Sequence, residues 1–474
     1  MLSVAKALEA LTFVASHEPV STLAKAFSKA GYEFALVGGP VRDAFLGREL
    51  NDLDFTTSAT PEEIERIVSP LARATWDIGR AYGTIAAQFD DQTVEITTFR
   101  ADEYERGNRK PKVEFGTSLR DDLSRRDFTI NSMAVVLPDL VLVDPCNGLD
   151  DLLAGYLKTP SEPQVSFSDD PLRMMRGARF ASQLGLAPDE ATLQAMAEMA
   201  SSIKEVSSER VRDELVRLIS TKSPRTGLEI LVETGIAEFI LPELPALRLE
   251  TDEHAHHKDV YQHTLKVLDQ AMDEEARRFP GAKPDVPLRI AALLHDIGKP
   301  ATRRFEPGGT VTFYHHDVVG AKLARTRLRA LRFDGDSIRS VAKLIELHLR
   351  FFGYSDQGWS DSAVRRYVRD AGDELERLHI LVRADVTTRN KRKADRLSFA
   401  YDDLEERIGS LAQQEEMRAV RPELNGDEIM ELLNLGPGRE VGEAYSFLLE
   451  LRLDEGQIGK EEARDRLLAW WRSR

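Results

Sequence analysis

The distribution of apolar and polar residues separates an α/β beginning from a long helical remainder. Between Tyr32 and about Val143, short runs rich in β-branched and aromatic residues alternate with stretches of helical periodicity. Strands are predicted at 34–37, 84–89 and 93–99, the last two joined by a turn at 90–92. After Asp170 the helical period dominates, and helices are predicted at 172–184, 189–201 and 208–219.

Length and composition describe a folded protein with several cores. The chain has 474 residues, which at roughly 150 residues per domain predicts a multidomain protein. Hydrophobic residues make up 42% and charged residues 30%, so a disordered or collagenous chain is excluded. The net charge of −16 argues against a surface that coats nucleic acid indiscriminately, but it does not exclude a local basic groove.

The cysteine content and the lack of long apolar runs narrow the class of protein. Cys146 is the single cysteine, which excludes a disulfide framework and a cysteine-based zinc site. No apolar run approaches the roughly 18–20 residues that a membrane span needs. We therefore expect a cytoplasmic protein without a membrane partner.

A glycine pair between the first predicted strand and the following helix is the first candidate binding site. Gly38 and Gly39 follow the strand 34–37, and helical periodicity begins near Val41. Backbone N–H groups at a helix N-terminus attract anionic phosphates. Arg42 adds a guanidinium group that can bind a phosphate oxygen. This pattern predicts a phosphate-binding turn at Gly38, Gly39 and Arg42.

Three carboxylates predict a metal site beside this turn. Asp52 and Asp54 are two residues apart in a sequence that predicts a strand, so both side chains lie on one face. Two hard oxygen ligands are what Mg²⁺ needs when substrate phosphates complete its coordination. Glu95, in a neighbouring predicted strand, is the candidate third carboxylate that supports a second metal. A Gly-Gly or Asp-x-Asp alone is usually a turn or a solvated strand end, but their order and spacing here favour function.

Segment 36–57 resembles the nucleotidyltransferase superfamily, specifically the class II tRNA nucleotidyltransferases, the CCA-adding enzymes, which share this head with bacterial poly(A) polymerases. Further segments are similar to that family's motifs in the same order, at 124–134, 144–152, 168–186, 207–215 and 423–444. The resemblance implies an α+β fold, with an α/β head built on a mixed or antiparallel sheet and a long all-α neck, body and tail. The implied domains are the nucleotidyltransferase head 1–157, the helical neck 158–245 for nucleotide template and RNA binding, the HD-type metal domain 246–400 and the acidic tail 401–474.

The template motif contains a pair of side chains suited to reading bases. Asp170 and Arg173 are i, i+3 on a predicted helix and so lie on one face. A carboxylate accepts and a guanidinium donates, which suits the amino group and ring nitrogen of cytosine and adenine but not the reversed pattern of uracil and guanine. Arg176 and Arg179 continue the face and can meet triphosphate charge. The resemblance assigns all four to nucleotide binding, although Asp169 stands where the family often has Glu.

The motif at 124–134 adds two more nucleotide-binding residues. The resemblance implies that Arg126 and Asp127 hold the phosphates and the sugar of the nucleotide. A carboxylate at Asp127 can accept a hydrogen bond from a ribose hydroxyl. Phe128 and Ile130 are expected in the core, because apolar residues alternate there.

Histidine and aspartate residues form a second constellation in the helical part. The segment "LLHDIGKP" resembles the signature of the HD phosphohydrolase superfamily, in which a His-Asp pair on a helix binds a divalent metal together with a His upstream and an Asp downstream. The superfamily's ligand positions match His263, His295, Asp296 and Asp385, and the second-metal positions of some members match His316 and His348.

The resemblance implies a CCA tRNA nucleotidyltransferase, which adds CMP and AMP from CTP and ATP to the tRNA 3′ end with Mg²⁺ and without a nucleic-acid template. The same motifs also fit a CC-adding enzyme, an A-adding enzyme or a poly(A) polymerase. An alternative of a different class is an HD-domain phosphohydrolase whose head serves as an RNA-binding module. The HD site would take a second divalent transition metal, Mn²⁺, Ni²⁺ or Co²⁺. The expected partners are the tRNA 3′ end, CTP and ATP, bound by a monomer.

Two basic stretches are candidates for contact with RNA phosphates. Residues 321–350 contain eight basic and three acidic residues, and residues 386–396 contain five basic and one acidic. The tail 401–474 has 18 acidic and 10 basic residues, so it carries half of the net negative charge. Local basic tracks are therefore compatible with the acidic total, and we expect salt to weaken RNA binding.

Overall fold

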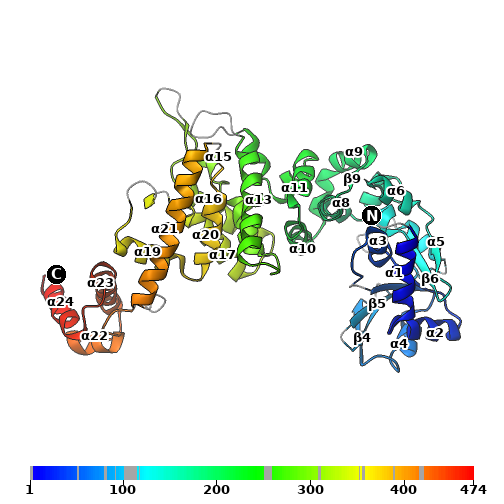
Figure 1. The fold of residues 1–474 in the computed structure, drawn as a ribbon, viewed down its shortest axis with the longest axis horizontal. Helices are drawn as coiled ribbons and strands as arrows, with labels where there is room; N and C mark the ends of the chain where they lie inside the picture. The colour runs from blue at the N-terminus through cyan, green and yellow to red at the C-terminus, as the bar shows by residue number, and fades with distance from the viewer. Residues whose placement is uncertain are drawn as a thin grey trace. The chain divides into compact units, whose positions relative to one another are not determined.

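The computed structural model divides the chain into two compact units, Met1–Ile240 and Leu241–Arg474 (Figure 1). None of the helices in the described part of the chain combines the length and apolar character that crossing a bilayer requires. The structure describes residues 4–50, 53–79, 83–90, 92–100, 115–116, 118–249, 259–307, 311–351, 353–354, 358–387, 390–415 and 421–473.

The first unit is built on a mixed seven-stranded sheet, as predicted. Its strand order is β3-β4-β5-β2-β1-β6-β7, and only β2 and β5 pair in parallel. The predicted strands 34–37 and 84–89 are confirmed, and the third begins and ends one residue earlier than expected. The strands are β1 Phe34–Val37, β2 Leu53–Thr57, β3 Ala74–Gly79, β4 Thr84–Phe89, β5 Gln92–Thr98, β6 Ala134–Leu137 and β7 Val141–Val143.

Helices cover both faces of this sheet. The rings of Phe27, Phe34 and Phe55 stack in series at 4.5 and 4.7 Å, which fixes α2 on one face. On the other face Ala35 and Val37 pack with residues of α5. Every residue of β1 is therefore buried. The head helices are α1 Val4–Ser16, α2 Val20–Ala30, α3 Gly39–Leu46, α4 Pro61–Val68, α5 Leu119–Ser124 and α6 Gly148–Ala154.

A helical neck completes the first unit, and its helices agree closely with the sequence pattern. The predicted helices 172–184 and 208–219 are confirmed, whereas the one predicted at 189–201 ends at Glu198 and a 3₁₀ turn follows. Gly177 lets the neck approach the head, because a Cβ there would lie 2.9 Å from the Phe128 ring. The neck helices are α7 Pro163–Asp169, α8 Leu172–Leu184, α9 Glu190–Glu198, α10 Ser208–Ile219, α11 Pro224–Glu233 and α12 Ala237–Ile240.

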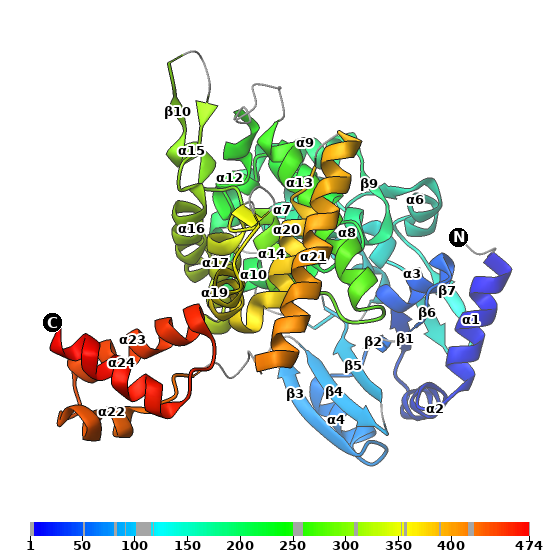
Figure 2. The same cartoon turned by 60° about the vertical axis from the view of Figure 1, so that its left-hand side comes forward.

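The second unit is helical, apart from a short hairpin of β10 (Arg304–Phe305) and β11 (Val311–Thr312). Figure 2 shows the long helix α21 of this unit, which packs on α19 and α20. Because α21 crosses residues 400–401, the division into four domains stays a prediction. The helices are α13 Val260–Arg278, α14 Val286–Leu294, α15 Lys299–Thr302, α16 His316–Ala330, α17 Gly335–Leu347, α19 Asp361–Ala371, α20 Leu375–Ala384, α21 Lys391–Glu415, α22 Gly426–Leu433, α23 Arg439–Glu455 and α24 Lys460–Arg472.

Candidate functional site

The candidate residues of the head gather at one edge of the sheet. Strand β1 is antiparallel to β2 and β6, and β2 is parallel to β5. The end of β1 therefore lies beside the starts of β2, β5 and β6. Gly38 follows β1, and its backbone N–H donates to the carbonyl of Met133, the residue before β6. The strand pairing thus brings together motifs that are about 100 residues apart in the chain.

The glycine turn needs glycine for its conformation and for space. Gly38 has a φ of 74°, in the left-handed region that favours glycine, and it is the N-cap of α3. A Cβ at Gly38 would lie 3.3 Å from Nη1 of Arg126. The Arg126 guanidinium is held from its other side by Asp122, with Nη2 at 3.2 Å from the carboxylate. A cation and the backbone amides at the start of a helix therefore border the same turn.

Asp54 and Glu95 lie directly opposite each other on the parallel strands β2 and β5. Both side chains are exposed, whereas the residues on either side of each are apolar or buried. Two carboxylates on one face offer the hard oxygen donors that suit Mg²⁺, so the residues present fit the predicted metal. Asp52, the other predicted ligand, lies outside the described residues.

Arg42 is buried and belongs to a polar network. Its Nη1 donates to Oδ1 of Asn131 at 2.6 Å, and its Nε and Nη2 bind Asp43 at 2.9 and 3.0 Å. Asn131 in turn donates to Asp127 at 3.0 Å, and Arg176 binds the other oxygen of Asp127 at 2.8 Å. The predicted residues Arg42, Asp127 and Arg176 are thus connected through Asn131, which we did not predict, although it lies within the motif 124–134.

The charge of Asp127 is stabilised by this network. Burial alone would raise the pKa of Asp127, but the Arg176 guanidinium, the Asn131 amide and the backbone N–H of Phe128 outweigh it and lower the pKa to about 2. The carboxylate therefore remains an acceptor at neutral pH.

Three arginines surround the Phe180 ring. The guanidinium carbons of Arg42, Arg176 and Arg179 lie 5.5, 5.5 and 4.2 Å from its centroid. An aromatic face attracts cations and spaces them, so Phe180 stabilises a concentration of positive charge between head and neck. Arg179 is also bound to Glu214 at 2.5 Å, which places it among buried partners rather than at an open surface.

The expected pairing of Asp170 with Arg173 on one helix face is wrong in its geometry. Asp170 is extended, with φ −148° and ψ 102°, because Pro171 follows it and disfavours a helical conformation. Its carboxylate binds Arg210 of α10 at 2.7 Å. Arg173, in the first turn of α8, donates to Ser166 Oγ and to the carbonyl of Arg125, both at 2.8 Å. Both side chains are therefore anchored, each by its own partners.

The histidine and aspartate residues of the second unit converge on one centre. These side chains form two sets of three. Within each set, the atoms that could bind a metal all lie within 4.8 Å of one another. All six positions that the HD signature predicted contribute, from the ends of five helices. The sets are His263, His295 and Asp385, and Asp296, His316 and His348.

The histidine rings are oriented by hydrogen bonds on the side away from this centre. Nδ1 of His295, His316 and His348 lies 2.9, 2.8 and 2.5 Å from backbone carbonyl oxygens three residues earlier. Since a carbonyl can only accept, Nδ1 carries the proton and Nε2 faces the centre. Nε2 of His295 and Nε2 of His348 are buried and form no hydrogen bond within the described part of the chain. This donor set fits a divalent metal.

The electrostatics of the centre favour a cation. Burial alone would lower the pKa of His295, but Asp296 and Asp385 outweigh it and raise that pKa to about 10. The pKa values of both carboxylates lie well below their usual range, because His295 and other cationic neighbours outweigh the effect of burial. Lys299 Nζ lies 3.0 Å from Asp296 and was not predicted, although it follows the His-Asp pair within the HD signature.

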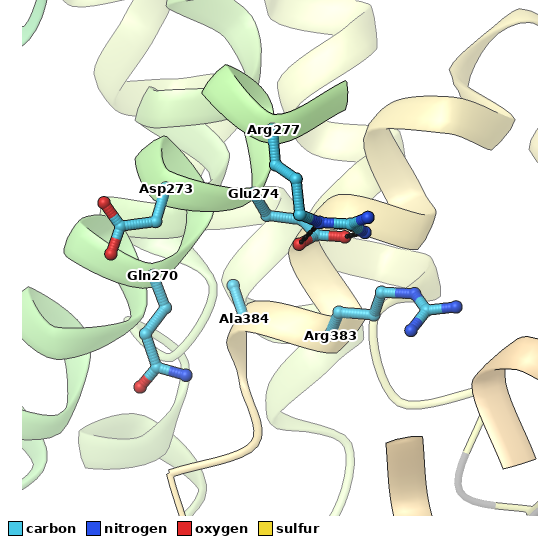
Figure 3. A pocket seen from close by; sticks show the side chains of 6 residues that line it. All are labelled: Gln270, Asp273, Glu274, Arg277, Arg383 and Ala384. Atoms are coloured by element: carbon cyan, nitrogen blue, oxygen red, sulfur yellow. Dashed lines mark hydrogen bonds and ion pairs between the residues drawn. The ribbon is translucent and has the colours of Figure 1, made fainter. Parts of the chain in front are cut away.

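A pocket of about 240 Å³ lies between α13 and the end of α20, and its lining reaches Ala384, the residue before Asp385 in the chain (Figure 3). Gln270, Glu274 and Arg277 of α13 line it together with Arg383 and Ala384 at the end of α20. Gln270 donates to the carbonyl of Val386 at 3.1 Å, which connects the pocket wall to the residue that follows Asp385.

Comparison with known families agrees with this organisation. Residues 34–158 match the family described as "Poly A polymerase head domain", residues 185–247 match "Probable RNA and SrmB- binding site of polymerase A", and residues 260–390 match "HD domain". The first match contains the sheet edge and the third contains the six residues that could hold a metal.

Curated relatives extend over nearly the whole chain. The A-adding tRNA nucleotidyltransferase of Deinococcus radiodurans is 34% identical over 446 residues, 92% of this chain and 95% of its own. The CC-adding enzyme of Thermus thermophilus is 31% identical over 92% of this chain and 93% of its own, and the CCA-adding enzyme of Enterococcus faecalis is 38% identical over 48% and 57%. The crystal structure of the Bacillus stearothermophilus CCA-adding enzyme in complex with CTP has the same fold, with a TM-score of 0.68 at 23% identity over 95% of this chain and 96% of its own. This chain is a nucleotidyltransferase and belongs to the CCA-adding tRNA nucleotidyltransferase family with an HD domain.

Proposed function

We propose that the protein adds CMP and AMP from CTP and ATP to the 3′ end of tRNA. The observation that carries the proposal is the edge of the head sheet, where the Gly38 turn, the opposed carboxylates of Asp54 and Glu95, and the Arg42–Asn131–Asp127–Arg176 network meet. Such a site combines the groups that hold a triphosphate with those that hold a metal. The proposal places the enzyme in the cytoplasm with its tRNA.

In the proposed reaction, the tRNA 3′-hydroxyl attacks the α-phosphorus of CTP or ATP and pyrophosphate leaves. Gly38, Gly39 and Arg126 bind the phosphates, while Arg42 supplies positive charge beneath the turn. Asp127 accepts a hydrogen bond from the ribose. Asp52 and Asp54, supported by Glu95, would hold Mg²⁺, which when bound supplies Lewis-acid stabilisation of charge at phosphorus.

For base selection we propose Asp170 and Arg173, supported by the arginines that follow. Arg210 fixes the Asp170 carboxylate, and Ser166 fixes Arg173, so the acceptor and the donor are held by separate contacts. Pre-oriented groups discriminate strongly, because a mismatched base leaves them without partners. Arg176 and Arg179, ordered by Asp127 and Glu214, contribute positive charge to the same region.

The choice among CCA, CC, A and poly(A) addition is tested with one assay. A tRNA ending at the discriminator base is incubated with CTP, ATP or both, and products are sized at nucleotide resolution. CCA addition gives three added nucleotides with both, two with CTP alone and none with ATP alone. Growth that stops at two with both nucleotides indicates CC addition, and long extension from ATP alone indicates poly(A) synthesis. A parallel reaction with a tRNA ending in CC detects A addition, which extends that tRNA by a single A and leaves the tRNA ending at the discriminator base unchanged.

As a second activity we propose metal-dependent phosphoester hydrolysis at the HD centre. The observation that favours it is the convergence of six buried or half-buried side chains, two of whose histidine nitrogens form no hydrogen bond with the residues that the structure describes. The test supplies Mn²⁺, Ni²⁺ or Co²⁺ and an RNA ending in a 2′,3′-cyclic phosphate without CTP or ATP. Hydrolysis that His295→Ala abolishes supports this activity. A phosphohydrolase with an inactive head would instead show hydrolysis and no nucleotide addition.

A further inference from the structure

The start of helix α21 carries unpaired positive charge. Lys391, Arg392, Lys393 and Arg396, which we call the α21 basic turn, are all exposed. None of the four has a side-chain hydrogen bond or an ion pair within the residues that the structure describes. Asp395 is the acidic residue among them, so the first six residues of α21 carry a net charge of +3.

This charge is unfavourable for the helix itself. The N-terminus of a helix is the positive end of its dipole and favours acidic residues, yet the first turn of α21 contains none. Asn390 caps the helix through its side chain, which accepts from the backbone N–H of Lys393 at 3.3 Å. Helix stability therefore does not explain the basic turn, and a residue pattern that opposes a local preference points to a function.

The other predicted basic stretch, residues 321–350, behaves differently. Of the eight cations in 321–350, four bind acidic residues within the second unit, which accounts for much of their charge. These are Arg325 with Glu346, Arg327 with Glu243, Arg339 with Asp336 and Arg350 with Asp370. The two stretches looked alike in sequence, but all four cations of the α21 basic turn lack an acidic partner among the residues that the structure describes.

Acidic residues further along α21 serve the fold instead. Asp402 binds Arg383 at 2.7 Å, and Glu405 binds Arg278 at 2.6 Å. These contacts fix the middle of the helix on α13 and α20. The charged residues in the middle of α21 therefore contact neighbouring helices, whereas the cations of its first turns face solvent.

The α21 basic turn lies close to the HD centre. Thr387 Oγ1 is 2.9 Å from Nδ1 of His263, and Asp385 offers a metal-binding oxygen beside the same histidine. Lys391 is four positions after Thr387, so their Cα atoms are at most about 14 Å apart. Positive charge at this distance can hold a polyanion whose end reaches the centre.

An exposed aromatic ring continues the basic turn along the helix. Phe399 is 74% exposed, and it follows Arg392 by seven residues and Arg396 by three, so the three lie on one helix face. Basic residues beside an exposed aromatic ring are typical of surfaces that bind single-stranded nucleic acid, because phosphates bind the cations and bases stack on the ring.

We propose that the α21 basic turn and Phe399 bind single-stranded RNA at the rim of the HD centre. The inference rests on the proposed RNA-directed function and adds a binding surface to it. The ligand is a polyphosphate strand with bases, so both the cations and the ring contribute to its affinity.

Fluorescence anisotropy of a 5′-labelled, twelve-nucleotide single-stranded RNA, titrated with the full-length protein over a range of salt concentrations, tests this surface. We expect Lys391→Ala/Arg392→Ala/Lys393→Ala to weaken binding at least tenfold at low salt. Loss of three phosphate contacts should also reduce the slope of log affinity against log salt by about 2. Removing cations from the helix N-terminus should not impair folding.

Two further variants separate base stacking on Phe399 from phosphate binding by the cations. Phe399→Ala should weaken binding about fivefold or more and leave the salt slope unchanged, because stacking releases no counterions. The control Arg339→Ala/Arg439→Ala/Arg466→Ala removes three exposed cations that already have acidic partners, and it should bind as the unmodified protein does. Unchanged affinity and slope in the α21 triple variant would overturn the inference, as would equal competition by polyglutamate.

The same proteins are assayed for CTP and ATP incorporation into tRNA. If the unmodified protein incorporates nucleotides but the α21 variants bind the oligonucleotide normally, the inference fails and the proposed function stands. If no protein incorporates nucleotides while the α21 variants lose oligonucleotide binding, the proposed function fails and the RNA-binding surface stands.

Discussion

Arg176 of α8 and Asp127, which are 49 residues apart in the sequence, are joined by two contacts, from Nε at 2.8 Å and from Nη2 at 2.6 Å to the same carboxylate oxygen. The pair links the neck to the head and holds the charge of both residues. Because Asp127 also accepts from Asn131, which binds Arg42, one carboxylate orders cations from two helices.

Replacing Asp127 with Asn should change how stability depends on pH. The folded-state pKa of Asp127 is about 2 against an ordinary value of 3.8, so ionisation stabilises the fold above pH 4, and this contribution is lost as the pH falls towards 2. This difference in pKa corresponds to about 2 kcal/mol in the free energy of unfolding. Urea unfolding should show Asp127→Asn less stable at pH 7 by about this amount, with the gap closing between pH 4 and 2. The exposed Asp139→Asn is the control, and an equal loss there would contradict the assignment.

Removing either opposed carboxylate should abolish catalysis without affecting the fold. Asp54 and Glu95 are exposed, so the isosteric changes Asp54→Asn and Glu95→Gln should preserve the packing of β2 and β5. If they hold the metal, CTP incorporation should fall by roughly 10²-fold or more, since metal stabilisation of the transition state is worth several kcal/mol. Asp90→Asn, at the turn between β4 and β5, is the matched control and should retain full activity. Unchanged incorporation in both strand variants would refute the metal site.

The sequence predicted the helices of the neck more accurately than the contacts of their side chains. Residues 172–184 and 208–219 have strong apolar periodicity, and packing on the head and on each other preserves it. Asp170 was placed on the helix face with Arg173, but Pro171 follows it and the chain there is extended. The Asp-Pro pair was visible in the sequence and could have predicted this.

Side-chain contacts between residues that are far apart in the chain could not be predicted from the sequence. Arg210 binds Asp170 over 40 residues and Asn131 binds Arg42 over 89, and neither separation has a local periodicity that could reveal it. Both partners nevertheless lie inside segments recognised as motifs. The six side chains that converge at the HD centre could each be named from the sequence because the HD signature specifies these positions, whereas the contact of Lys299 with Asp296 is visible only in the three-dimensional structure.

Base selection should depend on Arg173. Arg173→Ala removes a donor that Ser166 Oγ and the Arg125 carbonyl hold in place, so UTP and GTP should no longer leave a fixed group without a partner. We expect the preference for CTP over UTP to fall at least tenfold in kcat/KM. Arg212→Ala, on α10, is the control and should keep the preference. Unchanged discrimination against UTP and GTP would contradict the template role.

The close approach of neck and head should not tolerate a methyl group at Gly177. A Cβ there would lie 2.9 Å from the buried Phe128 ring, so Gly177→Ala should destabilise the first unit by about 1–3 kcal/mol, less whatever alanine gains in helix propensity. Gly409→Ala is the control, because a Cβ on that glycine of α21 meets no atom within 4 Å. This substitution should stabilise the protein by up to about 1 kcal/mol through helix propensity. Urea unfolding of both variants measures the difference, and equal effects would show that the Phe128 contact does not limit packing.

Two adjacent histidines provide a matched test of the metal centre. His316 is buried with Nε2 3.4 Å from Asp296, whereas His315 is exposed and belongs to neither ligand set. His316→Asn should weaken binding of Mn²⁺ or Ni²⁺ at least tenfold in isothermal titration calorimetry, because it removes one imidazole ligand from the second set. His315→Asn should bind as the unmodified protein does, since asparagine tolerates the positive φ of 63° at that position. CTP incorporation by the head should be equal in both variants. Equal metal affinity for the two would show that His316 is not a ligand, and equal loss in both would show that the substitutions act through the fold.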